Sequence, residues 1–141
     1  MRTEQENVDI AQDYCNKVSK RVTRAKWLKA ELERIEDSGL KGQIYSVGRP
    51  SGTVGVSLAA QVAMALDDTA DELNRAILEE TAALHEFYGR IKPLDETQQA
   101  VLVYRYLHGK PWDAVAKKTG IANSSAFKAH REALVAIGGS L

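Results

Sequence analysis

The chain has 141 residues, which is enough for one ordinary domain or for a small domain with a long helical extension. Charged residues make up 27% and aromatic residues 6%, a composition that favours a helix-rich, soluble protein over a β-sandwich. No apolar run approaches the roughly 20 residues of a membrane span, and the polar N-terminus lacks a signal-peptide core. The single cysteine, Cys15, excludes an internal disulfide, so we expect a cytoplasmic protein without membrane attachment.

The charge is balanced overall but unevenly distributed. The formal net charge of +0 by itself argues against nucleic-acid binding. However, residues 57–92 carry 7 acidic and 3 basic side chains, whereas residues 93–141 carry 6 basic and 4 acidic ones. The neutral average therefore hides a mildly basic C-terminal segment that could face DNA.

Residues 1–38 contain no proline or glycine, and their apolar pattern predicts one long helix from residue 8 to about residue 37. The apolar positions alternate at spacings of three and four, as in a coiled coil, with one violation at Arg21. Gly39 suits the end of this helix. The predicted stripe consists of Ala11, Tyr14, Val18, Ala25, Leu28, Leu32 and Ile35.

Residues 39–56 contain five glycines, Pro50 and several serines, which makes a helix improbable. We expect a flexible loop here. Its length is unusual within a compact domain, which indicates either disorder or a function.

Residues 57–92 form the second predicted long helix. Ser57 is a candidate N-cap, and Pro93 ends the helix because the residue before a proline disfavours helical geometry. The apolar stripe consists of Leu58, Val62, Leu66, Leu73, Ile77, Leu84, Phe87 and Ile91.

The two long helices are expected to pair as an antiparallel hairpin. In that register the basic segment 17–29 faces the acidic segment 65–77. Exposed ion pairs contribute little stability, so this charge match sets the register more than the stability. The same stripes could pair between two chains instead, and we expect a homo-oligomer formed through the long helices.

The sequence pattern of residues 93–141 predicts three short helices. Asp95 can cap a helix running to about Leu107, a turn follows around Gly109, and Pro111 suits the first position of the next helix.

The segment 111–137 has the layout of a DNA-binding helix-turn-helix, whose second helix enters the major groove. Gly120 can adopt the positive φ that ends a helix, and Ala116 is small enough for two helices to cross closely. The expected apolar contacts come from Val115, Ile121, Ala126, Ala133, Leu134 and Ile137.

Residues 94–116 resemble region 4 of sigma-70-type factors. They are more closely similar to the small phage and prophage late-transcription regulators of the ArpU/RinA type, which also have two long helices and a Gly-rich loop before this domain. Only the last 48 residues carry specific motifs. The matching residues are Tyr104 to Leu107, Gly109, Lys110, Trp112, Val115, Ala116, Gly120, Phe127 and His130 to Leu134.

The chain departs from the family pattern at two expected N-caps. Family members usually have Ser or Thr where Pro111 and Ala122 stand. We therefore expect Asn123 or Ser124 to cap the last helix, which would move its start by one or two residues. Ala126 replaces a bulkier β-branched residue, so packing under this helix should be looser.

The resemblance implies an all-α, phage-type transcriptional regulator that binds promoter DNA and activates late genes. Two alternatives stay open. One is a protein-interaction module that contacts RNA polymerase, with the acidic segment 67–86 as a contact surface. The other is a small phage DNA-packaging protein of the terminase type, which would bind DNA without promoter preference.

The candidate DNA contacts lie on the last helix and beside it. Asn can read adenine, Lys or Arg can read guanine, and Ser can contact a base or a phosphate. The base-reading candidates are Asn123, Ser124, Ser125, Lys128 and Arg131. The phosphate-contacting candidates are Lys110, Lys117 and Lys118.

Each candidate also has a purely structural interpretation. Asn123 and the two serines could only cap the helix, and the charged side chains could be ordinary solvated groups. For Arg105 we expect an internal salt bridge with Asp95, Glu96 or Asp113. Trp112 should cover the helix crossing, His130 should be a half-buried structural histidine, and Phe127 should pack against a neighbouring helix.

No enzyme motif has a usable context in the sequence. His85 and Glu86 lack the second histidine of a zinc-protease helix, and the Gly-rich stretch at residues 48–53 lacks the lysine of a phosphate-binding loop. We expect no enzymatic activity, no cofactor and no metal site.

Overall fold

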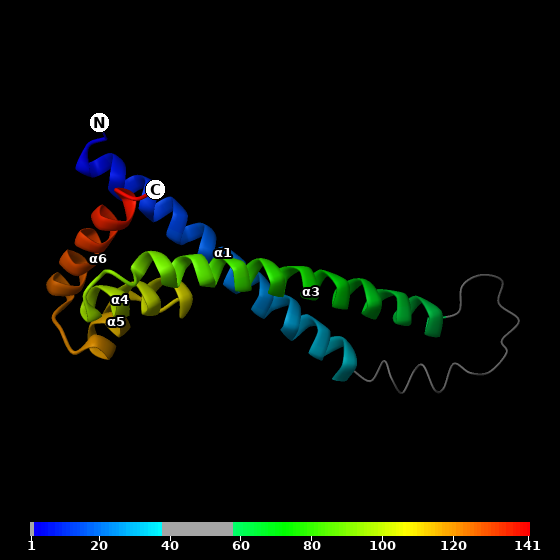
Figure 1. The fold of residues 1–141 in the computed structure, drawn as a ribbon. Helices are drawn as coiled ribbons and strands as arrows, with labels where there is room; N and C mark the ends of the chain where they lie inside the picture. Colours follow the sequence, from blue (N-terminus) through cyan, green and yellow to red (C-terminus); the bar gives the residue numbers. More distant parts are fainter. Residues whose placement is uncertain (1, 38–57) are drawn as a thin grey trace, which may run out of the picture. The chain divides into compact units, whose positions relative to one another are not determined.

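The computed structural model describes residues 2–37 and 58–141, which form helices joined by short turns with no strand among them (Figure 1). The all-α prediction is therefore confirmed. The expected flexible loop at residues 39–56 and the expected N-cap at Ser57 lie outside the described residues. The elements are α1 (Glu4–Asp37), α3 (Leu58–Ile91), α4 (Glu96–Leu102), the π-helical segment η1 (Val103–Leu107), α5 (Trp112–Thr119) and α6 (Asn123–Gly138). Within the described residues, no helix has the length and apolarity needed to span a bilayer.

The described residues form two compact units. The first unit contains the residues up to Val22 and those from Glu80 to Leu141, and the second contains the described residues between Thr23 and Glu79. Each long helix therefore contributes to both units.

The main core of the first unit joins α1 and the end of α3 to the C-terminal helices. Phe87 and Leu102 are fully buried, and Leu134 is almost as inaccessible. The cluster contains Val8, Ala11, Cys15, Val18, Val22, Phe87, Ile91, Leu102, Tyr106, Leu107, Ala133, Leu134 and Ile137. The first half of α1 thus supplies one wall of the core that supports α6.

The buried stripe of α1 corrects the predicted one. Cys15 is fully buried where the prediction used Tyr14, which is half-buried. Val22 is buried at the place in the stripe where the predicted pattern required Arg21 to be apolar. The buried positions keep spacings of three and four from Val8 to Leu28, so the apparent violation at Arg21 came from an error of one residue in the assigned register.

The second unit has a small core. Ala25 and Leu28 of α1 form a buried cluster with Ala76 of α3, and Leu73 packs against it. The predicted antiparallel register would have placed Leu28 near residue 66. Leu28 instead packs near Leu73 and Ala76, so the predicted register was wrong. Ile77 is 44% exposed, and Ala76 is buried in its place. A small residue at this position lets the helices approach closely without a large side chain between them.

The termini of the short helices follow local sequence signals. Asp95 is the N-cap of α4 and accepts a hydrogen bond from the Gln98 backbone N–H at 2.8 Å, as predicted. Gly120 ends α5 with a φ of 74°, also as predicted. Pro111 is the N-cap of α5 and not its first helical residue. The predicted shift in the start of the last helix was wrong: α6 begins at Asn123 after Ala122, which makes no side-chain cap.

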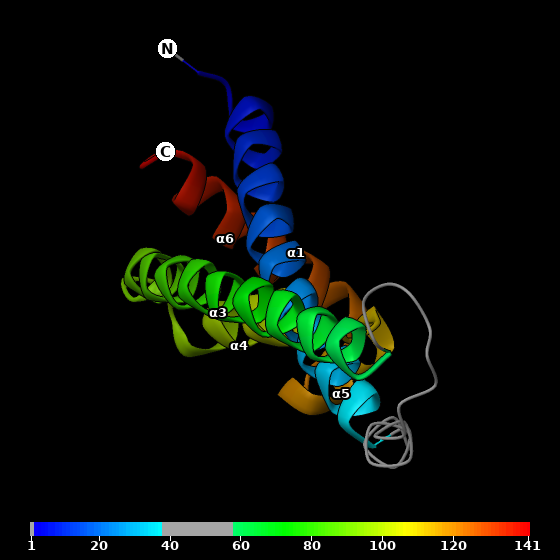
Figure 2. The same ribbon diagram turned by 90° about the vertical axis from the view of Figure 1, so that its right-hand side faces the viewer.

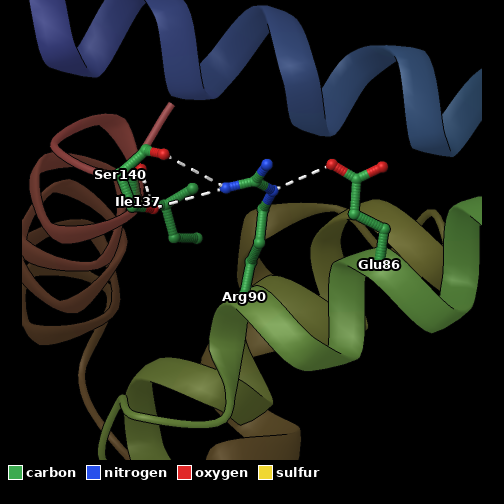
Figure 3. Close-up of polar contacts among 4 residues, drawn as sticks. All are labelled: Glu86, Arg90, Ile137 and Ser140. Atoms are coloured by element: carbon green, nitrogen blue, oxygen red, sulfur yellow. Dashed lines mark hydrogen bonds and ion pairs between the residues drawn. The ribbon is translucent and has the colours of Figure 1, made fainter.

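Arg90 connects the end of α3 to the C-terminus of the chain (Figure 3). Its guanidinium donates to the backbone oxygen and the hydroxyl of Ser140, both at 3.4 Å. It also forms an ion pair with Glu86 one turn earlier, at 3.0 Å. The Ser140 hydroxyl in turn donates to the Ile137 carbonyl at 2.8 Å, which satisfies one of the free carbonyls at the end of α6.

The N-terminal end of α1 lies beside the C-terminal end of α6 (Figures 1 and 2). Arg2 donates to the Leu141 backbone oxygen at 3.2 Å. Gly138 lies against the α1 backbone so closely that an added Cβ would stand 2.1 Å from the Asn7 oxygen. A side chain at this position is therefore incompatible with the packing of α1 on α6.

This close approach predicts that Gly138→Ala lowers the free energy of unfolding by about 1–3 kcal/mol, because the new methyl group forces α1 and α6 apart. Gly139→Ala is the matched control, since its Cβ would have no neighbour closer than 3.6 Å. The control should change stability by less than about 0.5 kcal/mol. Urea unfolding of both variants measures this, and equal effects would show that the approach at Gly138 is not a packing constraint.

Candidate nucleic-acid interface

The turn between α5 and α6 is fixed by backbone hydrogen bonds. The Ile121 N–H donates to the Ala116 carbonyl at 3.1 Å, and the Gly120 N–H donates to the Lys117 carbonyl at 3.3 Å. The Thr119 hydroxyl donates to the Val115 carbonyl at 2.8 Å. With the left-handed Gly120, these bonds satisfy the last carbonyls of α5 and set the direction in which α6 leaves the turn.

Helix α6 has one buried face and one exposed face. Its buried face begins with the small residues Ala126, Ala129 and Ala133 and continues with Leu134 and Ile137. Small side chains let α6 lie close to α4 and α5. The other face presents the side chains that the sequence predicted for base reading. This α6 surface consists of Asn123, Ser124, Ser125, Lys128 and Arg131, all of which are exposed.

The charged members of the α6 surface have acidic neighbours. Lys128 pairs with Glu132 one turn later at 4.0 Å. Arg131 contacts the first turn of α1, where it meets the Glu4 carboxylate at 3.5 Å and the Gln5 side-chain oxygen at 3.4 Å. These exposed pairs are weak and exchangeable with solvent or a ligand.

The polar members of the α6 surface do not cap the helix. The Asn123 amide donates to the Asp113 carboxylate of α5 at 2.8 Å, which holds the start of α6 to the start of α5. Among the described residues, neither Ser124 nor Ser125 has a side-chain hydrogen-bond partner, and α6 has no side-chain cap. The capping interpretation of these residues is therefore wrong.

The three predicted phosphate-contacting lysines lie near the two ends of α5. Lys117 and Lys118 are exposed in its last turn, where their charge also suits the negative end of the helix dipole. Lys110 is half-buried just before α5, and its carbonyl accepts a hydrogen bond from Arg105 at 3.1 Å.

Trp112 covers the crossing of α5 and α6, as predicted. Its ring centroid lies 4.8 Å from that of Phe127 and 4.7 Å from that of His130. Phe127 packs against Trp112 of the neighbouring helix α5, as expected, but its side chain stays 49% exposed. The prediction for Arg105 was wrong: its guanidinium lies over the Trp112 ring at 4.9 Å, and it pairs with none of the three acidic residues expected.

Tyr106 and His130 form a hydrogen-bonded, stacked pair under this aromatic cluster. The Tyr106 hydroxyl lies 2.7 Å from His130 Nε2, and the rings stack at 5.7 Å. Burial, together with the nearby Arg105 charge, lowers the pKa of His130 to about 4. Burial raises the pKa of Tyr106 above its usual value. His130 is therefore neutral at pH 7 and structural, as the sequence suggested.

Three features of this region were absent from the sequence interpretation. These are the contact of Glu4 with Arg131, the tie between Asp113 and Asn123, and the π-helical turn at Val103–Leu107. The first two join positions that no sequence motif links. The third has no glycine or proline within it that would mark a change of helix type.

Comparisons with protein-family models, with curated proteins and with solved structures found no match to this chain. In the part of the chain that the structure describes, no group of three or more His, Cys, Asp or Glu side chains could hold a metal ion.

The buried His130 predicts a loss of stability in acid. Between pH 6.5 and pH 4 the unfolded chain binds a proton at this histidine that the folded chain does not, so stability falls as the pH falls. The free energy of unfolding should drop by about 2 kcal/mol more from pH 7 to pH 4 in the wild type than in His130→Gln, after allowance for partial solvent screening. Glutamine keeps a hydrogen-bonding group for Tyr106. Parallel pH profiles in the two proteins would contradict a neutral, buried His130.

Proposed function

We propose that this chain is a sequence-specific DNA-binding regulator of transcription, an activator of phage or prophage late genes. In this proposal α5 and α6 form a helix-turn-helix like region 4 of sigma-70-type factors, and α6 is the recognition helix. The supporting observation is the division of α6, which buries an alanine-rich face and exposes Asn123, Ser124, Ser125 and Lys128 in its first two turns. Those are the turns that contact base edges in such motifs.

The chemistry of the α6 surface suits DNA. Lys128 and Arg131 can donate to guanine, and Ser124 and Ser125 have exposed hydroxyls for a base or a phosphate. Lys117 and Lys118 lie at the end of the preceding helix, where phosphate contacts would anchor the motif. DNA would displace the weak contacts of Lys128 and Arg131 with acidic neighbours.

The long helices support the proposed hairpin and oligomer. In the second unit, Ala25 and Leu28 share a core with Leu73 and Ala76, as an antiparallel pair of helices requires. This unit also exposes large apolar side chains that a second copy would cover. They are Trp27, Met64, Ile77 and Leu78, which are 62%, 60%, 44% and 70% exposed. A dimer would present two recognition helices to two half-sites.

A contact with RNA polymerase is the second candidate. Its support is the acidic stretch of α3, where Asp67, Asp68, Asp71 and Glu72 are all exposed. A contact through these carboxylates would weaken with salt as phosphate contacts do, so the candidates are distinguished by whether the chain binds duplex DNA at physiological salt. A DNA-packaging protein would bind duplexes of any sequence.

The function is tested by selection from randomised duplex DNA at physiological salt, using the wild type and the Lys128→Ala/Arg131→Ala double variant. We expect an enriched motif in the wild type and its loss in the variant, with about 1–3 kcal/mol of binding free energy lost for each base contact removed.

Lys92→Ala is the matched control, because it removes an exposed positive charge outside the proposed helix-turn-helix. The control should retain the motif. Absence of any enriched motif, with weak binding that is the same in all three proteins, would contradict the regulator proposal and favour a protein partner.

The pairing of Glu4 with Arg131 predicts that α1 restrains DNA binding. Glu4→Gln removes a carboxylate that competes with DNA for Arg131, so the affinity for the selected duplex should rise about two- to fivefold. Glu6→Gln, another exposed acidic residue of the same turn, should have a smaller effect. Fluorescence anisotropy measures both variants, and an equal gain would show general charge repulsion and no specific competition for Arg131.

A further inference from the structure

A polar cavity lies in the first unit between α1 and the C-terminal helices. Its volume is about 310 Å³, near the lower limit for small-molecule sites. Its walls include Gln12, Asn16 and Ser19 from α1 and Arg105, Trp112 and His130 from η1, α5 and α6. The α1 residues follow spacings of four and three, so they lie on one face of the helix and line one side of the cavity.

Arg105 supplies an oriented positive charge in this cavity. Its guanidinium is held by the Trp112 ring at 4.9 Å and by a hydrogen bond to the Lys110 carbonyl at 3.1 Å. That bond uses one of its five N–H donors. No carboxylate of the described residues pairs with it, so the remaining donors are available to a ligand.

The polar groups that α1 brings to the cavity are neutral and available. Within the described part of the chain, the side chains of Gln12, Asn16 and Ser19 have no hydrogen-bond partner. No acidic side chain of the described residues lines the cavity, and His130 adds no charge because its burial keeps it neutral at pH 7. The net charge of the lining is therefore that of Arg105.

The π-helical segment positions Arg105 and Tyr106 at the cavity. The His108 N–H donates to the Val103 carbonyl at 3.1 Å, five residues earlier, so the turn is wider than an α-helical turn. Such π-bulges are intrinsically unfavourable and occur frequently at functional sites. This observation is independent of the cavity lining and points to the same residues.

We propose that this cavity binds a small oxyanion, a phosphate or carboxylate carried on a polar body no larger than a mononucleotide. The Arg105 guanidinium donates to the oxyanion in a bidentate manner, and the amides of Gln12 and Asn16 bond to the polar body. A free small molecule fits these neutral groups of α1 better than a DNA backbone phosphate, which would need only the cation. The site goes beyond the proposed DNA contacts and does not depend on them.

The test is isothermal titration calorimetry of the full chain without DNA. The phosphate probes are inorganic phosphate, ribose 5-phosphate and adenosine monophosphate, and the carboxylate probes are succinate and citrate. At least one probe should bind with a dissociation constant below about 1 mM. Asn16→Asp places a negative charge in the cavity at an exposed helical position and should weaken that binding at least about tenfold. Asn74→Asp, the same change at an exposed position of the second unit, should not.

Arg105→Gln should weaken the same binding at least about tenfold. Arg24→Gln is its control, because Arg24 is exposed in the second unit and does not line the cavity. Asn16→Asp keeps the test decisive if loss of Arg105 unfolds the protein. Failure of every probe to bind, or binding unchanged in Asn16→Asp, would overturn the proposal. If no probe binds but Asn16→Asp weakens duplex binding, the oxyanion is a DNA phosphate and the small-molecule site is wrong.

Discussion

The structure depends on burial of the inner face of α6 by a helix that is more than 80 residues earlier in the chain. Leu134 and Ile137 are almost fully buried, and their cluster includes Val8, Ala11 and Cys15 of α1. A domain of fewer than about 70 residues rarely obtains enough stability from its own core, so the short C-terminal helices gain from a wall supplied by α1. Gly138 shows how close this packing is, because the α1 backbone occupies the space of a side chain there.

This arrangement gives the two ends of α6 different environments. Its C-terminal half is fixed by α1 and by the contacts of Arg90 with Ser140, while its first turns bury Ala126 and expose their outer face beside α5. A helix whose inner face is packed along its length is suited to presenting the polar side chains of its outer face to a partner without large rearrangement. The same helix also brings Glu4 to Arg131, and other residues of it form one wall of the cavity at Arg105. Stability, access to the α6 surface and the proposed ligand site are thus connected through one helix.

Local signals predicted the helices and some of their termini, and long-range packing decided what the sequence could not show. The cap at Asp95 and the left-handed turn at Gly120 follow from intrinsic preferences of those residues. The stripe of α1 was assigned one residue wrongly at Cys15 and Val22, because spacings of three and four from Ala11 allow either Tyr14 or Cys15 as the next position. Arg105 was expected beside an acidic side chain, yet its guanidinium lies over the Trp112 ring. Arg105 belongs to the π-helical turn, and no residue type in that segment predicts the change of helix type. The partners of Asn123 and Arg131 depend on how distant segments meet, so periodicity carries no information about them.

The proposed contact of α6 with duplex DNA can be observed at the level of single residues. The ¹⁵N-labelled chain is titrated with a duplex at physiological salt and followed in amide NMR spectra. We expect the largest shifts at residues 123–131 and in the last turn of α5, with residues 67–79 unaffected. Shifts concentrated in the acidic stretch of α3, or none at all on α6, would contradict it.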